Sequence, residues 1–384
     1  MAKLGEVCTI VSGSTPKTSV TSYWDGNIKW ITPAELNEDT FYIMDSVRHI
    51  TEEGKEKTGL SYLPTGTVIL SSRAPIGKTA IAGCKMCCNQ GFKNLICSDA
   101  IYNEYLYFFL KSKTDYLNSL GRGATFKEIS KSIVESIEIP LPEVKQQKEI
   151  VEKFKKLEQL ISLRKQQLAK LDELIKAQFV EMFGDCKTNP KNWKTKALEK
   201  IANVGSSKRV FVEELQDNGI PFYRGTEIGA LAEKKAVIPA LFITEEHYKQ
   251  LCETTGKPQK GDLLMPSICP DGRIWIVDTD EPFYFKDGRV LWVHLTSANY
   301  NSVFLLYTLK DRIMTDYASI ASGTTFAELK IFALKKCKIF DVPLELQNQF
   351  ATFVEHVDQQ KQTVQQSLEK LELMKKALLQ EYFG

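Results

Sequence analysis

The hexapeptide Gly123-Ala124-Thr125-Phe126-Lys127-Glu128 returns at an offset of 200 positions as Gly323-Thr324-Thr325-Phe326-Ala327-Glu328. Further matches at this offset pair Leu168, Lys170 and Leu171 with Leu368, Lys370 and Leu371, and Phe183-Gly184 with Phe383-Gly384. Chance similarity between two helices of like composition would account for the Leu and Lys matches. It hardly accounts for an ungapped Gly-x-Thr-Phe-x-Glu and a Phe-Gly at one common offset. The sequence therefore predicts two tandem copies of one unit.

Each copy is predicted to be a globular α+β part followed by one long helix. The expected domains are residues 1–142 and 185–342, and the expected helices are 143–184 and 343–384. Short apolar runs bounded by Gly and Pro predict strands at 67–70, 93–97, 262–265, 274–277 and 290–295. Helices are expected at 104–111 and 302–312, each after an Asn. The glycines of the first copy, Gly66 and Gly77, share their spacing with Gly261 and Gly272.

The long helices carry a heptad stripe of apolar residues. Its members are Phe154, Leu157, Ile161, Leu168, Leu171 and Ile175 in the first helix and Val354, Val357, Val364, Leu368, Leu371 and Leu378 in the second. Arg164 and Gln178 interrupt the first stripe, and Lys361 and Lys375 interrupt the second. A narrow stripe suits a helix seam better than a sheet, so the two helices are expected to pair as an antiparallel coiled coil. The alternative is that each helix caps its own domain.

This geometry favours a DNA-binding role. A helix of about 40 residues is roughly 60 Å long. An antiparallel pair would carry two similar domains related by an approximate two-fold axis, as dimeric DNA-binding proteins do. Because the two copies differ in sequence, the two DNA segments that they read should differ as well.

Composition bounds the class of protein. The chain has 384 residues, 43% of them hydrophobic, and a formal net charge of only +2. No apolar run reaches the roughly 18 residues of a membrane span, and the first residues lack a signal-peptide pattern. Nine cysteines without a disulfide spacing fit free thiols in a reducing compartment, so a cytoplasmic location is expected.

Catalytic motifs are missing from the sequence. Ile76-Gly77-Lys78-Thr79 looks like the end of a phosphate-binding loop, but Ser72 stands where the first glycine of that motif belongs. The cysteines at 84, 87 and 88 have no second pair or suitably spaced histidines for zinc. No amino-methylation tetrapeptide or nuclease signature is found. We expect no metal, no cofactor on this chain and no enzymatic activity of the chain by itself.

Polar and basic loop residues are the candidates for DNA contacts. Hydroxyls, backbone N–H groups and cations position phosphates, and a guanidinium reads guanine in the major groove. The candidates are Ser14, Thr15, Lys17, Thr32, Arg73, Lys78 and Arg122 in the first copy and Ser206, Lys208, Arg209, Arg224, Arg273 and Arg289 in the second. For any single candidate, a solvated surface role remains the alternative. The low net charge suggests that partner subunits supply many backbone contacts.

Further motifs carry a resemblance to a known family. They are the repeated Gly-x-Thr-Phe-x-Glu, the helix start Leu141-Pro142-Glu143-Val144-Lys145-Gln146-Gln147, the helix end Phe183-Gly184-Asp185, and Asn189-Pro190-Lys191-Asn192-Trp193. Over essentially its whole length the chain resembles the specificity subunit of type I restriction–modification systems. In the second copy the helix start reads Val342-Pro343-Leu344-Glu345-Leu346-Gln347, with its Pro shifted by one place.

The resemblance implies both a role and partners. Each globular part would be a target-recognition domain reading one half of a bipartite, gapped site in double-stranded DNA, with the helices fixing the gap. Two methyltransferase subunits would dock on the chain and methylate adenine with S-adenosylmethionine, and restriction or translocase subunits could join them. The alternatives from other classes are a self-sufficient DNA-modifying enzyme and a coiled-coil scaffold without DNA specificity.

Overall fold

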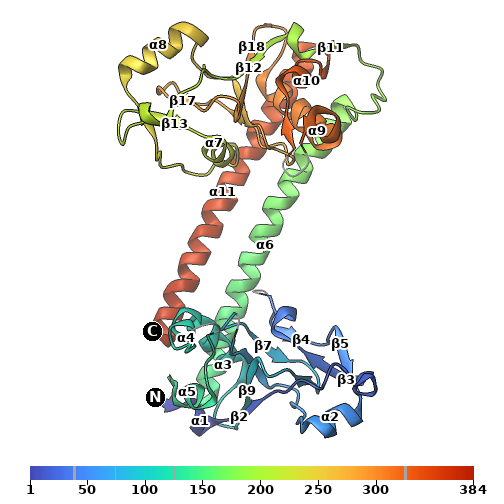
Figure 1. Ribbon diagram of the computed structural model, residues 1–384, viewed down its shortest axis with the longest axis vertical. Coiled ribbons are helices and arrows are strands. Elements are labelled where there is room, and N and C mark those ends of the chain that lie inside the picture. The colour runs from blue at the N-terminus through green and yellow to red at the C-terminus, as the bar shows by residue number, and fades with distance from the viewer. Residues whose placement is uncertain (38–39, 74, 124–126, 324–326) are drawn as a thin grey trace. The chain divides into compact units, whose positions relative to one another are not determined.

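The computed structural model describes residues 1–37, 40–73, 75–123, 127–323 and 327–384 (Figure 1). These residues form two compact units, Met1–Gln166 with Gln365–Gly384, and Gln167–Val364. Each unit holds one α+β domain and one part of each long helix. The centres of the repeated hexapeptides, residues 124–126 and 324–326, lie outside the described residues, so that part of the repeat is not compared below.

The first unit is built on three sheets. A five-stranded sheet has the order β2 (Cys8–Ser12), β9 (Phe92–Cys97), β6 (Val68–Ser71), β7 (Thr79–Ala82) and β4 (Tyr42–Ile43). A three-stranded sheet has the order β5 (Arg48–Ile50), β3 (Trp24–Ile31) and β8 (Cys87–Cys88), and β1 (Ala2–Lys3) pairs with β10 (Glu138–Ile139). The helices are α1 (Leu4–Val7), η1 (Thr21–Tyr23), η2 (Pro33–Glu35), α2 (Glu52–Thr58), α3 (Asn103–Ser112), α4 (Thr114–Ser119) and α5 (Lys131–Ser136).

The central strands of the five-stranded sheet are buried on both faces. Successive side chains of a strand point to opposite faces, so Val68 and Leu70 join a core with the aromatic side chains of α3, whereas Ile69 joins a second core with Ile31 and Phe92. Such a strand reads as a continuous apolar run in the sequence. This explains why the strand at 67–70 was predictable without any alternation of polar and apolar residues.

The second unit repeats this topology. Its main sheet has the order β12 (Ala202–Gly205), β18 (Val290–Leu295), β15 (Leu263–Pro266) and β16 (Trp275–Ile276), and its second sheet has the order β14 (Phe242–Ile243), β13 (Ile220–Tyr223) and β17 (Tyr284–Phe285). Two further pairs are β11 (Thr195–Ala197) with β21 (Lys338–Phe340) and β19 (Ala321–Ser322) with β20 (Glu328–Leu329). The helices are η3 (Leu198–Lys200), η4 (Val212–Glu214), α7 (Gly225–Ala232), α8 (Glu245–Thr255), α9 (Ser302–Ile320) and α10 (Ile331–Lys335).

The equivalence of the units extends to strand direction. In the first unit β3 runs antiparallel to β5 and parallel to β8, and in the second β13 runs antiparallel to β14 and parallel to β17. The four glycines with shared spacing all have positive φ, from 67° to 97°. In each unit they stand just before the third strand of the main sheet and in the turn after it. The repeat in the sequence is therefore a repeat of topology and turn geometry.

A buried glutamine joins each domain to its long helix. Gln147 is fully buried: its Oε1 accepts from the Tyr102 N–H at 2.7 Å, and its Nε2 donates to the carbonyls of Ala100 (3.0 Å) and Pro142 (2.8 Å). Gln347 is buried likewise and makes the equivalent bonds to Asn301, Asn299 and Val342 at 2.9, 3.1 and 2.9 Å. We call these residues the glutamine clamps.

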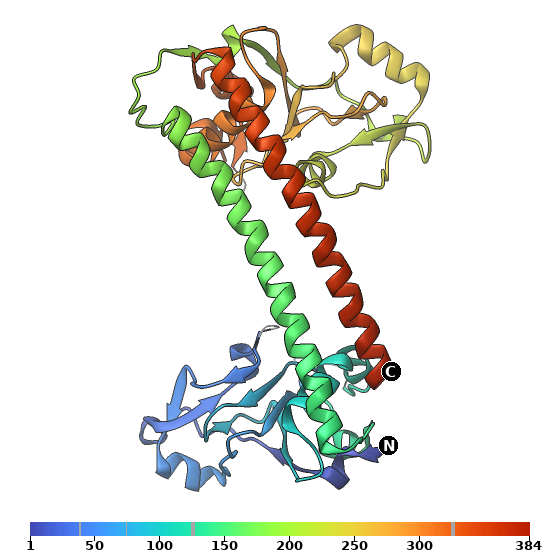
Figure 2. The ribbon, with the colours of Figure 1, turned by 180° about the vertical axis from the view of Figure 1, so that it is seen from behind.

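The long helices are α6 (Val144–Phe183) and α11 (Leu344–Phe383), each without interruption (Figure 2). Within each unit their segments pack antiparallel. In the first unit Glu158 pairs with Lys375 at 2.7 Å and Arg164 Nε donates to Ser367 Oγ at 3.2 Å; in the second, Asp172 pairs with Lys361 at 2.5 Å. Three of the four polar residues that interrupt the apolar stripes thus bond across the helix pair.

Most of the residues predicted for the seam are buried. The buried ones are Phe154, Leu157, Ile161, Leu171, Ile175, Val354, Val357, Val364 and Leu368, whereas Leu168, Leu371 and Leu378 are half-buried. The heptad frame missed the buried Phe179, Phe183, Phe350 and Phe383 near the helix ends, where the stripe drifts from the heptad positions and the domains contribute packing partners.

The α+β fold class with an antiparallel helix pair is confirmed. The expected strands lie within two residues of the observed ones, and the helix expected at 302–312 continues to Ile320 past a non-helical Asp316. In the described part of the chain, no helix is both long and apolar enough to cross a membrane.

Candidate nucleic-acid interface

In each unit, four segments that are far apart in the sequence meet at one end of the central strands of the main sheet. In the first unit they are residues 32–36, 72–73, 89–93 and the arms 122–123 and 127–129, which together we call the first loop cluster. The Ser72 N–H donates to the Gly91 carbonyl at 2.8 Å, and the Ile129 N–H donates to the Ser72 carbonyl at 3.0 Å. Arg122 and Glu128 exchange backbone hydrogen bonds at 3.1 and 3.0 Å. These bonds fix the last three of these segments to each other.

The second unit contains the equivalent segments, residues 224–228, 266–268, 288–291 and the arms 321–323 and 327–329. We call them the second loop cluster. The Ser267 N–H donates to the Arg289 carbonyl at 2.9 Å, and the Leu329 N–H donates to the Ser267 carbonyl at 2.7 Å. Ser322 pairs with Glu328 as Arg122 does with Glu128. Both clusters therefore share one backbone frame.

In each unit a capped turn follows the central strand of the three-stranded sheet. After β3, Glu35 accepts the Thr32 N–H at 2.7 Å and its Oγ1–H at 3.1 Å; after β13, Glu227 accepts the Arg224 N–H at 2.9 Å. A reciprocal bond from the third helical residue stabilises a helix start. The sequence carries a signal for this feature, because Glu35-Leu36 resembles Glu227-Ile228, but the match does not by itself reveal the capping role.

The charge on the second capped turn is internally paired. Arg224 bonds Glu227 with Nη2 at 2.7 Å and Nε at 3.2 Å. Burial alone would raise the pKa of Glu227, but the bonds from the side chain and backbone of Arg224 and from Thr226 outweigh it and lower the pKa to about 2. Arg224 and Glu227 therefore present a fixed, charged pair next to the loops at neutral pH.

Lys78 and Arg273, the basic residues after the matched glycines, both bond to groups of their own unit, and Lys78 braces the first capped turn. Lys78 Nζ donates to the carbonyls of Leu36 at 2.6 Å and Pro33 at 3.2 Å. Arg273 pairs with Asp271 at 2.7 Å and Glu233 at 3.8 Å, beyond the end of α7. Both cations have partners within the protein, so a DNA contact from either remains a prediction that requires the side chain to serve two roles.

The other candidates lie in loops that follow the first strand of each main sheet. Ser14 accepts from Trp30 Nε1 at 2.9 Å through its carbonyl, and Thr15 bonds Gln90. Ser206 Oγ donates to the Val290 carbonyl at 2.6 Å. The Lys17, Lys208 and Arg209 side chains are exposed, and Arg209 lies 5.5 Å from the ring centroid of Phe211.

Residues that the sequence did not single out hold the clusters together. Lys93 is buried and pairs with Glu128 at 3.0 Å. Glu328 pairs with Arg289 and, at 3.4 Å, with Lys330. Glu128 and Glu328 both end the repeated hexapeptides, so their identity at one offset was the available signal.

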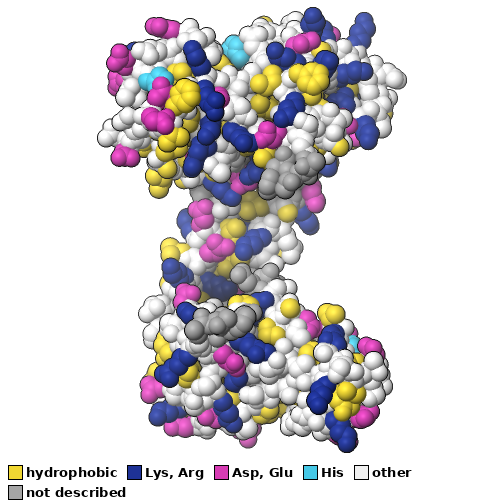
Figure 3. Space-filling model, in the orientation of Figure 1, with side chains coloured by type: hydrophobic (Ala, Val, Ile, Leu, Met, Phe, Trp, Pro, Cys, Tyr) yellow, Lys and Arg dark blue, Asp and Glu magenta, His cyan; other side chains and the backbone are white. Residues whose placement is uncertain are grey.

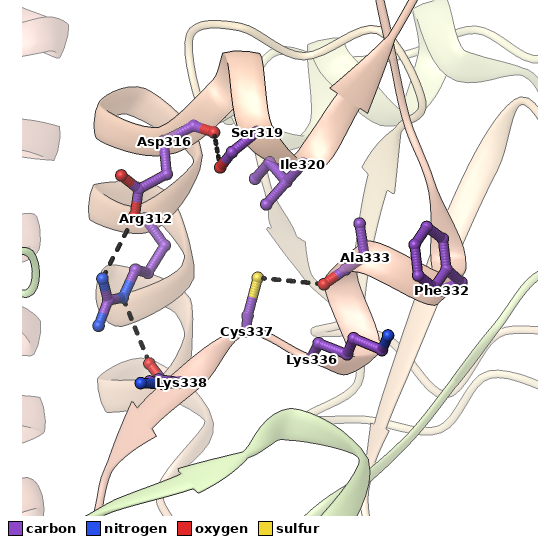
Figure 4. A pocket seen from close by; sticks show the side chains of 9 residues that line it. All are labelled: Arg312, Asp316, Ser319, Ile320, Phe332, Ala333, Lys336, Cys337 and Lys338. Atoms are coloured by element: carbon purple, nitrogen blue, oxygen red, sulfur yellow. Dashed lines mark hydrogen bonds and ion pairs between the residues drawn. The ribbon is translucent and has the colours of Figure 1, made fainter.

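A hollow of about 350 Å³ lies in the second unit between α9, α10 and β21 (Figure 4). Arg312 bonds Asp316 and the Lys338 carbonyl, and Cys337 Sγ donates to the Ala333 carbonyl. Burial raises the pKa of the Cys337 thiol to about 11, so it is not an activated nucleophile. The lining residues form no catalytic arrangement of nucleophile and base.

Lys and Arg side chains gather on this face of the second unit (Figure 3). Lys330, Lys336 and Lys338 are exposed there, whereas the positions 200 residues earlier hold Ser130, Ser136 and Glu138. At these three positions the second unit is basic and the first is not.

The cysteine-rich segment is part of the core. Cys87 and Cys88 are buried in β8, and burial raises the pKa of their thiols to about 11 and 12. Among residues 1–37, 40–73, 75–123, 127–323 and 327–384, no group of three or more His, Cys, Asp or Glu is arranged to hold a metal ion.

Known proteins share this architecture. The family described as "Type I restriction modification DNA specificity domain" matches twice, at residues 1–173 and 190–373. The type I restriction enzyme MjaIX specificity subunit of Methanocaldococcus jannaschii is 30% identical over 98% of this chain and 90% of its own length. The EcoR124I/EcoR124II specificity subunit of Escherichia coli is 26% identical over 46% of this chain and 45% of its own.

Solved structures agree at the level of fold. The S subunit of a type I restriction–modification system from M. genitalium covers 100% of this chain and 95% of its own, with a TM-score of 0.54 and 16% identity. A chain from a study of complex assembly and conformational transition of the type I system covers 100% and 96%, with a TM-score of 0.65 and 18% identity.

Each of the duplicated domains is followed by one long helix. This arrangement defines a tandem two-domain protein with a loop cluster in each domain. With the family matched over both copies, the chain belongs to the type I restriction–modification DNA specificity domain family. The resemblance seen in the sequence is confirmed. The relatives from M. jannaschii and E. coli are named as specificity subunits, which supports the expectation that the chain is not itself an enzyme.

Proposed function

We propose that this chain recognises a bipartite, gapped site in double-stranded DNA and directs partner subunits to it. The observation that carries the proposal is the pair of loop clusters, which share one backbone frame and differ in the side chains that they present. A common frame suits a common ligand, and different side chains suit different base sequences. Each domain then reads one half-site.

The proposed partners are two methyltransferase subunits, which bind S-adenosylmethionine and methylate adenine. Restriction or translocase subunits are proposed to join the same complex. The exposed Lys330, Lys336 and Lys338 of the second unit support a DNA ligand, because neutralised phosphates supply most of the sequence-independent affinity. The chain itself is proposed to work without a cofactor and in the cytoplasm.

Sequencing of the methylome tests this function directly. DNA is compared between a host that expresses the chain with its neighbouring methyltransferase and a host that expresses the methyltransferase alone. We expect N6-methyladenine at a two-part gapped motif only in the first host. Unchanged methylation, with both proteins expressed and associated, would favour a scaffold without DNA specificity.

The two helices are proposed to set the gap between half-sites. Replacing Leu171 and Leu371 together by Asp places charges on the apolar stripe and should abolish methylation of the gapped motif. Gln166→Asp with Gln365→Asp, on exposed positions of the same helices, is the control. Wild-type methylation by the double Leu variant, at the original gap, would refute the role of the helix pair.

A further inference from the structure

The shared frame of the loop clusters assigns each position in one cluster a counterpart in the other. Ser72 and Ser267 make the same two backbone bonds, so Gly91 corresponds to Arg289 and Glu128 to Glu328. The strand registers agree, because Leu70 pairs with Lys93 and Met265 pairs with Leu291. The residue after each serine is Arg73 in the first cluster and Ile268 in the second.

The two clusters carry an arginine on different segments of the shared frame. In the first cluster it extends from the segment after β6, as Arg73, and the neighbouring segment carries Gly91. In the second cluster the neighbouring segment carries the arginine, Arg289, and the segment after β15 carries Ile268. Each cluster therefore holds one arginine at the junction of the two segments.

The packing around Gly91 shows that the two arginines occupy neighbouring space. A Cβ placed on Gly91 would lie 3.4 Å from Arg73 Nε and 3.0 Å from Pro33 Cγ in the capped turn. In the second cluster the Arg289 carbonyl lies 3.3 Å from a Cβ placed on Gly225, at the start of the equivalent turn. Arg73 thus extends over the spot from which Arg289 starts.

The glutamates of the clusters have changed partners accordingly. Glu128 pairs with Lys93, and among the described residues no carboxylate lies within ion-pair distance of Arg73. In the second cluster Leu291 replaces Lys93, and Glu328 pairs with Arg289 instead. Arg289 is still 56% exposed in its side chain, and Arg73 is half-buried. Both guanidinium groups are held near the loop edge without being enclosed.

We propose that Arg73 and Arg289 are equivalent specificity-determining residues, each of which reads one guanine in its own half-site. Two parallel N–H groups of a guanidinium match the O6 and N7 acceptors of guanine in the major groove. This inference rests on the proposed function and narrows its set of candidate contacts to one residue per domain. It also assigns other paired cations to contacts within the protein, Lys78 to the first capped turn and Arg273 to the end of α7.

The test uses the chain in complex with its methyltransferase, after the methylome has given both half-sites. Arg73→Gln should relax discrimination at one G·C pair of one half-site, and Arg289→Gln should do the same in the other half-site. The expected loss of discrimination is roughly 5- to 150-fold, as for a bidentate arginine–guanine contact. Lys57→Gln and Lys249→Gln, exposed positions on α2 and α8, remove the same charge outside the clusters and should leave both half-sites unchanged.

A duplex with 7-deazaguanine in place of guanine removes the N7 acceptor alone. It should weaken binding by the wild-type complex and leave binding by the matching Gln variant unaffected. Arg73→Lys and Arg289→Lys keep the charge without the planar fork, and each should discriminate its G·C pair less well than the wild-type chain does. They also separate a lost contact from a folding defect, together with the unfolding temperature of each variant.

Three results would overturn the inference. One is a uniform loss of affinity across all sequences with a shallower salt dependence, which marks a phosphate contact. Another is that both variants change the same half-site, and the third is that neither changes any base preference. Absence of any gapped motif that depends on the chain would instead refute the proposed function itself.

Discussion

Replacing the glutamine clamp of the first unit, Gln147→Leu, should destabilise the junction between the first domain and α6. Leucine has a similar length and keeps the site filled, so the main loss is that of three hydrogen bonds. Without them the Tyr102 N–H and the carbonyls of Ala100 and Pro142 lose these partners. Each hydrogen bond contributes about 1 kcal/mol net, so we expect the free energy of opening to fall by roughly 3 kcal/mol. The added apolar burial of leucine offsets part of this loss.

Hydrogen exchange is the suitable assay, because a chain of two units need not unfold in one step. The free energy of opening is measured by mass spectrometry for peptides that cover residues 98–112. Gln146→Leu, on the exposed neighbouring position, is the control and should stay within about 0.5 kcal/mol of wild type. Equal protection in the two variants would refute the view that the clamp carries this energy. Gln347→Leu should act in the same way on the second unit.

Three further predictions concern charge, pH and turn geometry. Glu158→Lys places a like charge opposite Lys375 across the helix pair and should lower the stability of the first unit. Adding Lys375→Glu should restore much of that stability. A double variant no more stable than the single one would argue against a direct ion pair. The pKa of Glu227 falls to about 2 in the fold from an ordinary value near 4.5. The stabilisation by the ionised Glu227 carboxylate is therefore complete above pH 4.5 and lost as the pH falls toward 2. In Glu227→Gln, the acid unfolding of the second unit should lack this pH-dependent loss of stability. An acid unfolding profile identical to that of wild type would contradict the lowered pKa. Gly77→Ala should destabilise the first unit by about 1–3 kcal/mol, because φ is 97° and the new Cβ would meet Thr114 Cγ2 at 2.9 Å; Gly59→Ala, with φ 67° but open space, should cost less, and equal thermal shifts would show that packing at Gly77 is unimportant.

Local signals in the sequence predicted the larger part of the fold. The heptad stripe gave both long helices, since amphipathic periodicity is a property of neighbouring residues. The Gly-x-Thr-Phe-x-Glu repeat gave the duplication. The pairing of β3 with β8 and of β13 with β17 was not predictable, because these parallel neighbours are more than fifty residues apart and short strands carry no mark of their partners.

The candidate site was predicted at the level of loops rather than of single contacts. Residue type identified Lys78 and Arg273 as cations near the loops, but it could not show that carbonyls and carboxylates of the same unit already surround them. The correspondence between Gly91 and Arg289 was hidden for another reason. The offset between the copies is 198 there, because insertions and deletions differ among the loops, and only the hydrogen-bonded frame aligns the two positions.

The two halves of this chain also amount to a record of divergence after duplication. Gln147 and Gln347 and the left-handed glycines have kept both identity and role, whereas the arginine of the loop clusters stands on one segment in the first unit and on the neighbouring segment in the second. One substitution on each of two adjacent segments is enough to move the arginine of a loop cluster. Such a change can alter which bases the domain prefers without altering the glutamine clamps or the turns. Evolution of specificity in such a protein is then a matter of few substitutions, all of them outside the residues that hold the architecture together.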